Sequence, residues 1–202
     1  MDSFDFTTMM RPSPVVLVLG KRNAGKTTLV RDILGHLNPE KPVVFAPPNE
    51  GGDVTRIYDD VVQPIFEEYD PNVVEAIVNG TRKDVDVVVL DDCIFGTPDS
   101  HVQNLFYNGR QHRVALVMTQ SRPTLPPCLR ANADYVFILG DQNRTNRLRI
   151  YAMHADRMFP TFEAFCETMD TIDSRGCLVL DLARGGVFSY KASIKASPTH
   201  MK

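Results

Sequence analysis

Short runs of β-branched and other apolar residues alternate with helical patterns along most of the chain. Each run holds about five to seven residues, which is typical of strands buried on both faces of a parallel sheet. We expect strands at residues 15–20, 42–46, 85–91, 114–120 and 135–140. Because helical patterns lie between these runs, the sequence predicts right-handed crossovers and an α/β fold with a mostly parallel central sheet flanked by helices.

The helical patterns rest on apolar residues that recur every three or four positions. Such patterns occupy residues 29–37, 102–109 and 162–169. Residues 54–80 are also predicted to be helical, with breaks near residues 70–71 and 79–80, where proline and glycine occur.

The two ends of the chain have patterns of their own. Residues 1–13 are mostly polar, and Pro12 and Pro14 mark the start of the first predicted strand. Residues 1–13 are therefore predicted to form a flexible arm. Two apolar runs, residues 177–182 and 187–191, flank a glycine-containing turn and predict a C-terminal β-hairpin at the edge of the sheet. We therefore expect one domain over residues 14–195, followed by a flexible tail at 196–202.

Length and composition exclude several classes of protein. With 202 residues the chain can bury the core of one domain, and no apolar run approaches the length needed to cross a bilayer. The first residues lack a basic start followed by an apolar stretch, so we expect a protein that is not secreted. A net charge of −3 argues against a generally basic coat for nucleic acid. The cysteines show no C-x-x-C pairing and are predicted to be reduced thiols: Cys93, Cys128, Cys166 and Cys177.

Residues 20–27 read GKRNAGKT and fit the pattern G-x-x-x-x-G-K-[ST] without a mismatch. A predicted strand precedes them and a predicted helix follows, which is the context that a phosphate-binding loop requires. The glycines let successive N–H groups converge on phosphate oxygens at the positive end of the helix dipole. The phosphate loop, residues 20–28, is therefore predicted to bind a nucleotide through Gly20, Lys21, Arg22, Asn23, Ala24, Gly25, Lys26, Thr27 and Thr28.

Two side chains of this loop are predicted to contact the phosphates of ATP. Lys26 would place a positive charge on the β- and γ-phosphates, and the hydroxyl of Thr27 would take part in a Mg²⁺ site. The alternative is an ordinary glycine turn with Lys26 as a solvated residue. The full match in the right context favours the nucleotide site.

The predicted strand at residues 85–91 closes on two carboxylates, Asp91 and Asp92. Asp91 is expected to hold Mg²⁺ and Asp92 to polarise the attacking water. Consecutive strand residues point to opposite faces, so the two acids can serve one site only if the strand ends there. A turn before a helix would also explain the pair, and an aspartate reaches one methylene less far than a glutamate, which weighs against Asp92 as the base.

Two further polar residues follow a predicted strand and a predicted helix. Gln120 would lie beside the γ-phosphate if its strand neighbours both the loop strand and the acidic strand; otherwise it simply starts a turn. Arg110 and Arg113 end the helix before that strand. They either stabilise the helix carboxyl end, or an arginine there acts on the ATP of a neighbouring subunit. The physical chemistry of the sequence leaves both interpretations open.

Several short motifs occur in a fixed order: GKRNAGKTT (20–28), VVVLDD (87–92), GR (109–110), TQSRP (119–123) and LRANAD (129–134). In this order they resemble the FtsK/HerA superfamily of DNA-translocating ATPases. More narrowly, the chain from about residue 15 to the terminal hairpin resembles the poxvirus-type genome-packaging ATPases of nucleocytoplasmic large DNA viruses. FtsK proteins carry Asp-Glu where this chain has Asp91-Asp92, whereas the viral branch has an Asp-Asp pair.

This resemblance implies a RecA-like (ASCE) P-loop NTPase core, with Walker A at residues 20–28 and Walker B at residues 87–92. It implies ATP hydrolysis with Mg²⁺ at the subunit interfaces of a homo-oligomeric ring, hexameric or pentameric, through which double-stranded DNA is threaded. The catalytic residues would be Lys26, Asp92, Gln120 as sensor and Arg110 as an arginine finger acting in trans.

The same resemblance implies packaging of viral DNA into a capsid. A capsid or inner-membrane virion protein would be the partner. The expected locations are the virus factory in the host cytoplasm and the virion, for a soluble chain.

Without the resemblance, DNA binding is only weakly indicated. Candidate basic stretches are Arg82-Lys83, Arg144 with Arg147 and Arg149, and Lys191 with Lys195. Ordinary solvated charges are the simpler explanation for each of them. A translocating ring nevertheless needs few cations per subunit, because the positive charges of identical loops add up around the pore.

Three other functions compete with a DNA motor. A nucleoside or nucleotide kinase would need an acceptor pocket and an arginine-bearing lid, and the paired zinc cysteines of viral-type thymidine kinases do not occur here. A GTPase would need an N-K-x-D string, which the sequence lacks. A nucleotide-binding structural subunit without turnover is the third alternative.

Overall fold

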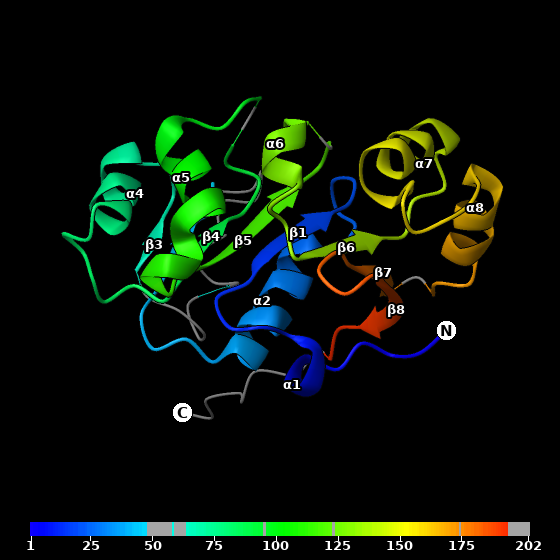
Figure 1. The fold of residues 1–202 in the computed structure, drawn as a ribbon, viewed down its shortest axis with the longest axis horizontal. Coiled ribbons are helices and arrows are strands. Elements are labelled where there is room, and N and C mark those ends of the chain that lie inside the picture. The colour runs from blue at the N-terminus through cyan, green and yellow to red at the C-terminus, as the bar shows by residue number, and fades with distance from the viewer. Residues whose placement is uncertain (48–57, 59–63, 95, 123, 174, 194–202) are drawn as a thin grey trace, which may run out of the picture.

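The computed structural model describes residues 1–47, 58, 64–94, 96–122, 124–173 and 175–193. Helices lie on both sides of a central sheet, and the six strands nearest the amino terminus are mutually parallel (Figure 1). These parallel strands are β1 (Val15–Leu19), β2 (Pro42–Phe45), β3 (Ile65–Phe66), β4 (Val87–Leu90), β5 (Ala115–Gln120) and β6 (Tyr135–Leu139).

The last two strands form a hairpin at one edge of the sheet. β7 (Gly176–Asp181) pairs antiparallel with β6, and β8 (Gly186–Lys191) pairs antiparallel with β7. The strand order across the sheet is β3-β2-β4-β5-β1-β6-β7-β8. The predicted fold class, a mostly parallel α/β sheet with a C-terminal hairpin at its edge, is confirmed.

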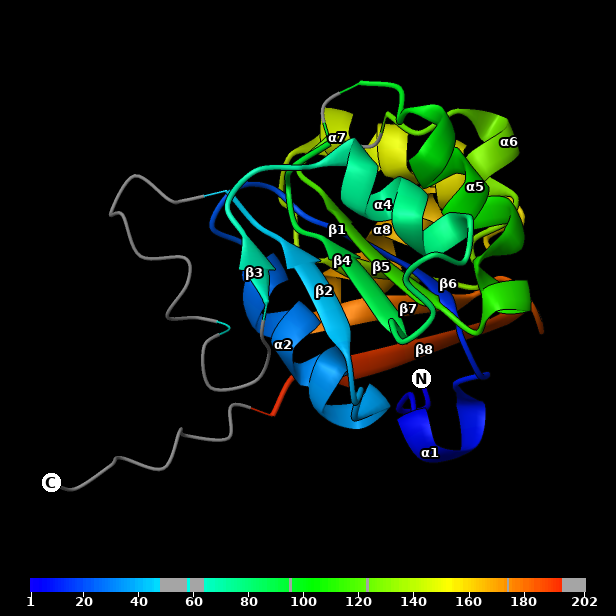
Figure 2. The same cartoon turned by 90° about the vertical axis from the view of Figure 1, so that its left-hand side faces the viewer.

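Helices cover the two faces of the sheet unequally (Figure 2). One face carries α4 to α8 and the other carries α2 with the short α1. The bounds are α1 Phe6–Met9, α2 Lys26–Leu37, α4 Pro71–Val78, α5 Ser100–Asn108, α6 Pro127–Arg130, α7 Arg144–Ile150 and α8 Phe162–Asp170. A 3₁₀ helix (Gly109–His112) continues α5, and a π-helical turn (Tyr151–Ala155) continues α7.

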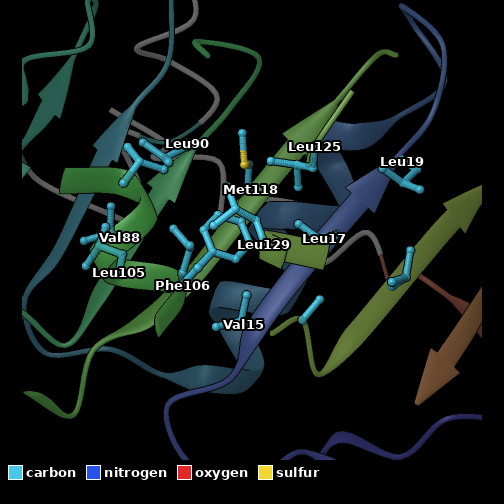
Figure 3. Close-up of a cluster of buried hydrophobic side chains, with 14 of the residues drawn as sticks. Val15, Leu17, Leu19, Val88, Leu90, Leu105, Phe106, Met118, Leu125 and Leu129 are labelled. Atoms are coloured by element: carbon cyan, nitrogen blue, oxygen red, sulfur yellow. The ribbon is translucent and has the colours of Figure 1, made fainter. Parts of the chain in front are cut away.

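Alternate residues of each central strand enter different layers of the core. In β1, Val15, Leu17 and Leu19 pack beneath α5 and α6, whereas Val16 and Val18 pack against α2. Figure 3 shows the first of these layers, in which Leu129 of α6 lies over β1 and β5. Both faces of β1 are therefore buried, which is why its sequence is apolar without alternation.

The segment 1–13 was predicted to be a flexible arm, and its packing corrects that prediction. Phe4 and Phe6 are only 3% and 7% exposed, because their rings pack against Phe137 of β6. The amide of Phe4 also donates to the carbonyl of Ser189 in β8 at 2.8 Å. Two buried aromatic residues therefore anchor an otherwise mostly exposed polar segment to the sheet.

Part of the segment 54–80 also differs from its predicted helix. Ile65–Phe66 form β3, which pairs with β2 at the outer edge of the sheet. The predicted break near residue 70 is present, because Asp70 caps α4 by accepting from the amide of Asn72 and Pro71 occupies the first helical turn. Tyr58 is helical and fully buried, and most residues between 48 and 63 lie outside the described ones.

The strand order brings together segments that are distant in the sequence. β5 lies between β1 and β4, with Leu19 paired to Gln120 and Leu90 paired to Met118. The carboxyl ends of these three parallel strands therefore meet at one edge of the sheet. This confirms the neighbour relationship on which the prediction for Gln120 depended.

Candidate functional site

A cavity of about 870 Å³ opens at the edge where β1, β4 and β5 end. Its wall combines residues 22–28 of the phosphate loop, apart from Ala24, with Asp92, Gln120 and Ser121. Because the lining comes from all three strand ends, the cavity depends on the sheet order described above. A volume of this size suits a ligand as large as a nucleotide.

The phosphate loop takes left-handed backbone conformations at two positions. Asn23 has φ 62° and Gly25 has φ 98°, a region that glycine enters without steric penalty and that asparagine tolerates. Gly25 is also the N-cap of α2 and offers no side chain to cap the helix. The first amides of α2 consequently lack side-chain partners and can bind an anion at the positive helix end.

Lys26 is almost buried, with 5% of its surface exposed. Its ammonium group donates to Ser121 Oγ at 2.9 Å and to the carbonyl of Lys21 at 3.3 Å, and it forms an ion pair with Asp92 at 2.8 Å. The phosphate loop and the acidic strand end are therefore joined through Lys26. A buried ammonium group held only by polar partners at a cavity wall is well placed to contact phosphate.

Asp91 is buried and accepts three hydrogen bonds from side chains. Its Oδ2 accepts from Thr27 and from Tyr58, each at 2.8 Å, and its Oδ1 accepts from Thr119 at 2.8 Å. Burial, followed by the charge of Asp91, holds the pKa of Tyr58 well above its ordinary value of 10, so the phenol stays protonated and donates. Asp91 is thus fixed toward Thr27, the residue with which it was predicted to share a Mg²⁺ site.

Asp92 turns out of the strand immediately after Asp91. Its φ of 49° lies in the left-handed region, and its amide donates to Thr119 Oγ1 at 2.8 Å. β4 ends at Leu90, so the opposite-face rule for strand residues does not separate the two acids. Asp91 reaches Thr27 while Asp92 reaches Lys26, and both carboxylates face the phosphate loop.

Three side chains of this site were missed by the sequence analysis. The hydroxyl of Thr119 accepts from the amide of Asp92 and donates to the carboxylate of Asp91, and Ser121 donates to Asp92 at 3.0 Å. Both residues flank Gln120 at the end of β5. Their position next to a predicted sensor is the feature of the sequence that could have identified them as site residues. Tyr58 has no comparable signal, because only the tertiary fold brings it to Asp91.

Gln120 is buried, with 4% of its surface exposed, and its side chain lines the cavity. Its Nε2 lies 3.5 Å from Thr124 Oγ1, and its Oε1 has no hydrogen-bond partner among the described residues. Buried amide oxygens are usually satisfied. An unpaired acceptor here can receive a hydrogen bond from a water or ligand in the cavity.

The donor set near Thr27 suits Mg²⁺. This ion prefers hard oxygen ligands and is commonly held by one or two protein oxygens together with substrate phosphates and waters. The hydroxyl of Thr27 and the carboxylate of Asp91 supply such oxygens 2.8 Å apart. Within the described ranges, no group of three or more His, Cys, Asp or Glu residues could hold a metal by itself.

Arg110 lies at the other end of the sheet from the phosphate loop of its own chain. It precedes the start of β5, and its Nη2 donates to both carboxylate oxygens of Asp134 at 2.8 and 2.6 Å. Arg11 also donates to Asp134, whose Oδ2 accepts from the amide of Val15 at the start of β1. The structure therefore does not bring Arg110 together with Lys26, and half of the Arg110 side chain is exposed.

The basic stretches considered for DNA binding have different surroundings. Arg147 is buried and pairs with Asp170 at 2.7 Å, so its role is structural. Arg144 lies over the ring of Phe162 at 4.9 Å, and Lys191 pairs with Asp173 at 2.6 Å. Lys195 lies outside the described residues.

All four cysteines are free, and burial raises the pKa of Cys93 to about 12. Among the helices of the described segments, none has the length and apolar character required to cross a membrane.

Sequence comparisons place the chain among viral proteins. No protein-family model matches it. It is 30% identical over 167 residues to protein 075L of invertebrate iridescent virus 6, which covers 74% of this chain and 63% of that protein. It is 28% identical over 203 residues to protein 015R of frog virus 3, and this match covers 90% of this chain and 62% of that protein. The chain thus spans slightly less than two thirds of either relative.

Structural comparisons identify the fold. The genome-packaging NTPase B204 of Sulfolobus turreted icosahedral virus 2, solved with ATPγS, matches with a TM-score of 0.70 at 15% identity, over 92% of this chain and 100% of B204. ATPases 2 and 3 of EssC from Geobacillus thermodenitrificans match with a TM-score of 0.58 at 14% identity. This match covers 92% of this chain and 41% of the EssC chain. The chain therefore has the P-loop NTPase fold seen in B204, and its sequence relatives are proteins of large DNA viruses.

Proposed function

We propose that the chain is an ATPase that translocates double-stranded viral DNA into a capsid, as one subunit of a five- or six-membered ring. One observation carries the ATPase part of this proposal. Lys26 and Thr27 of the phosphate loop contact Asp92 and Asp91 directly, at 2.8 Å in each case, beside a nucleotide-sized cavity. The DNA part is supported by the fold and by the viral origin of the relatives.

Each residue of the cavity has its own role in the proposed reaction. The amides of the phosphate loop and the ammonium group of Lys26 bind the phosphates of ATP, while Thr27 and Asp91 are the proposed Mg²⁺ ligands. Bound Mg²⁺ would neutralise charge on the β- and γ-phosphate oxygens. Asp92 accepts a proton from the attacking water, and Gln120 positions that water through its unpaired Oε1.

The site of one chain is proposed to be completed by the next subunit. A transition state with charge on the γ-phosphate oxygens requires a planar cation, and arginine supplies one. Arg110 lies at the amino ends of the strands, so it is remote from its own phosphate loop and half exposed. A head-to-tail ring would place it against the neighbouring cavity.

The biological setting is proposed from the relatives. We propose action in the virus factory of the host cytoplasm and in the virion, with a capsid or inner-membrane virion protein as anchor. Native mass spectrometry with ATP and Mg²⁺ tests the ring, because a defined pentamer or hexamer is expected. A chain that stays monomeric under these conditions would contradict it.

Product analysis separates the competing functions. Purified chain is incubated with ATP and Mg²⁺ alone, with linear double-stranded DNA, or with a mixture of nucleosides and nucleoside monophosphates. Phosphate release that DNA accelerates supports the motor, whereas transfer of phosphate to a nucleoside or nucleotide supports a kinase. Nucleotide binding without either product supports a structural subunit. The Lys26→Ala variant, analysed in parallel, identifies any contaminating activity.

A further inference from the structure

A second cavity, of about 500 Å³, lies away from the nucleotide pocket. It is built where the chain enters β6, between residues 130–134 and the π-helical turn Tyr151–Ala155. α6 and α7, which lead into these segments, lie on the same face of the sheet (Figure 1). The described residues that line this cavity are all different from those that line the nucleotide pocket.

Positive charge predominates in the second cavity. Its lining includes four arginines and two aspartates: Arg11, Arg110, Arg130, Arg157, Asp134 and Asp156. The carboxylate of Asp134 is occupied by Arg11 and Arg110, whereas Asp156 is exposed. Arg130 donates to the carbonyl of Leu125 at 3.1 Å, and Arg157 is exposed. Since each guanidinium has five N–H donors, most donors remain available to a ligand.

His154 supplies an independent sign of a ligand. It belongs to the π-helical turn, is only 5% exposed, and lines the cavity. Neither Nδ1 nor Nε2 has a hydrogen-bond partner among the described residues. Buried polar atoms are nearly always paired, and single π-helical turns are frequent at functional sites. Two orphaned ring nitrogens beside arginines therefore indicate a group that is bound there.

The electrostatics of His154 indicate what kind of group this is. Burial, followed by the charge of Arg130, lowers the pKa of His154 to about 4. The imidazole is therefore neutral at pH 7 and offers one N–H donor. A neutral donor surrounded by planar cations is suited to an oxyanion, because guanidinium groups match the geometry of phosphate oxygens.

We propose that this cavity binds a phosphate group, with the ring N–H of His154 and the guanidinium groups of Arg130 and Arg157 as donors. The cavity is larger than a single phosphate, so the group would be carried by a larger molecule, either a nucleotide or a DNA strand. The proposal depends neither on ATP hydrolysis nor on the assembly of a ring.

Binding to this cavity can be measured by NMR of the His154 imidazole. The full chain is labelled with ¹⁵N-histidine, the ring resonance of His154 is assigned by its loss in His154→Gln, and inorganic pyrophosphate is titrated at pH 7. A saturable shift of the His154 resonance is expected. Arg157→Ala should raise the apparent Kd for this shift about tenfold, since one charged hydrogen bond is lost. Arg175→Ala, which removes an exposed arginine outside the cavity, should leave the Kd unchanged.

A second variant distinguishes binding in this cavity from binding in the nucleotide pocket. In Lys26→Ala the nucleotide pocket loses its main phosphate contact, yet the His154 shift should persist with the same Kd. An unchanged His154 resonance in wild type, or a shift that disappears in Lys26→Ala, would overturn the proposal. ATP and a short DNA duplex then replace pyrophosphate in Lys26→Ala. A shift with ATP identifies a nucleotide as the source of the phosphate, and a shift with DNA alone identifies the DNA backbone.

Discussion

The ammonium group of Lys26 lies 2.8 Å from Oδ2 of Asp92, so the lysine of the phosphate loop is held by the acid that follows β4. Ser121 strengthens this link, because its hydroxyl contacts both residues. A triphosphate that enters the loop competes with Asp92 for the same ammonium group. Phosphate binding would thus release the carboxylate that is proposed to accept a proton from water.

Lys26→Ala is expected to reduce ATP hydrolysis by about a hundredfold or more, because a preorganised cation for the γ-phosphate is lost. Folding stability should change little, since the side chain of Asp92 is 36% exposed and can be solvated by water. Phosphate release and thermal unfolding measure the two effects. Lys83→Ala, at an exposed position away from the loop, is the matched control. Hydrolysis near the wild-type rate in Lys26→Ala would refute the assignment.

Thr119→Val should weaken the acid pair while preserving side-chain shape. The hydroxyl of Thr119 donates to Oδ1 of Asp91 and accepts from the part-buried amide of Asp92, so valine removes a partner from both groups. We expect a loss of about 2 kcal/mol in the free energy of unfolding. We also expect about a tenfold rise in the Mg²⁺ concentration needed for half-maximal ATPase rate.

Thr119→Ser is the control for this experiment, because it keeps the hydroxyl and removes only a methyl group. Its Mg²⁺ requirement should remain that of the wild type. Equal Mg²⁺ requirements in the valine and serine variants would show that the hydroxyl does not support Asp91.

Arg110→Ala is expected to retain nucleotide binding and to lose hydrolysis by about a thousandfold, the size of effect typical of an arginine finger. Binding is measured with a fluorescent ATP analogue and hydrolysis by phosphate release. Mixing Arg110→Ala with Asp92→Ala should restore part of the activity, because some interfaces then combine an intact Arg110 with an intact Asp92. Arg113→Ala, an exposed arginine three residues away, should behave like wild type. Full activity of Arg110→Ala would remove Arg110 from the mechanism.

Stability is expected to fall in mild acid because of His154. The folded chain holds the pKa of this imidazole near about 4, below its ordinary value of 6.5, so the unfolded chain binds more protons between these pH values. Lowering the pH from 7 to 5 should therefore reduce the free energy of unfolding by about 2 kcal/mol through this residue. Urea unfolding in phosphate-free buffer measures the change, and His154→Gln should lack this component. An identical pH dependence in both proteins would contradict the assignment.

The sequence predicted most of the sheet because buried parallel strands are continuous apolar runs. β1, β2, β4, β5 and β6 all lie within their predicted ranges. The phosphate loop could likewise be predicted, since its pattern is local and its neighbours in the chain supply the required strand and helix. The position of Gln120 could be stated only as a condition on the strand order, and the adjacency of β1, β5 and β4 brings Gln120 and the acid pair to one edge of the sheet.

The remaining features depend on tertiary contacts that no local pattern encodes. Phe4 and Phe6 are single aromatic residues in a polar segment, and their burial depends on rings from distant parts of the chain, among them His36, Tyr135 and Phe137. Tyr58 reaches Asp91 across 33 positions of the chain, and Arg110 reaches Asp134 across 24. β3 is only two residues long, too short for an alternating pattern to outweigh the helical periodicity of its surroundings.

The proposed ATP-driven movement along DNA can be measured by displacement of a triplex. A third-strand oligonucleotide is bound near one end of a linear DNA duplex, and its release is followed after addition of the purified chain, Mg²⁺ and ATP. Release should require ATP and should be absent with Lys26→Ala. ATP hydrolysis that proceeds at the same rate with and without DNA, with the triplex left intact, would contradict the proposed movement.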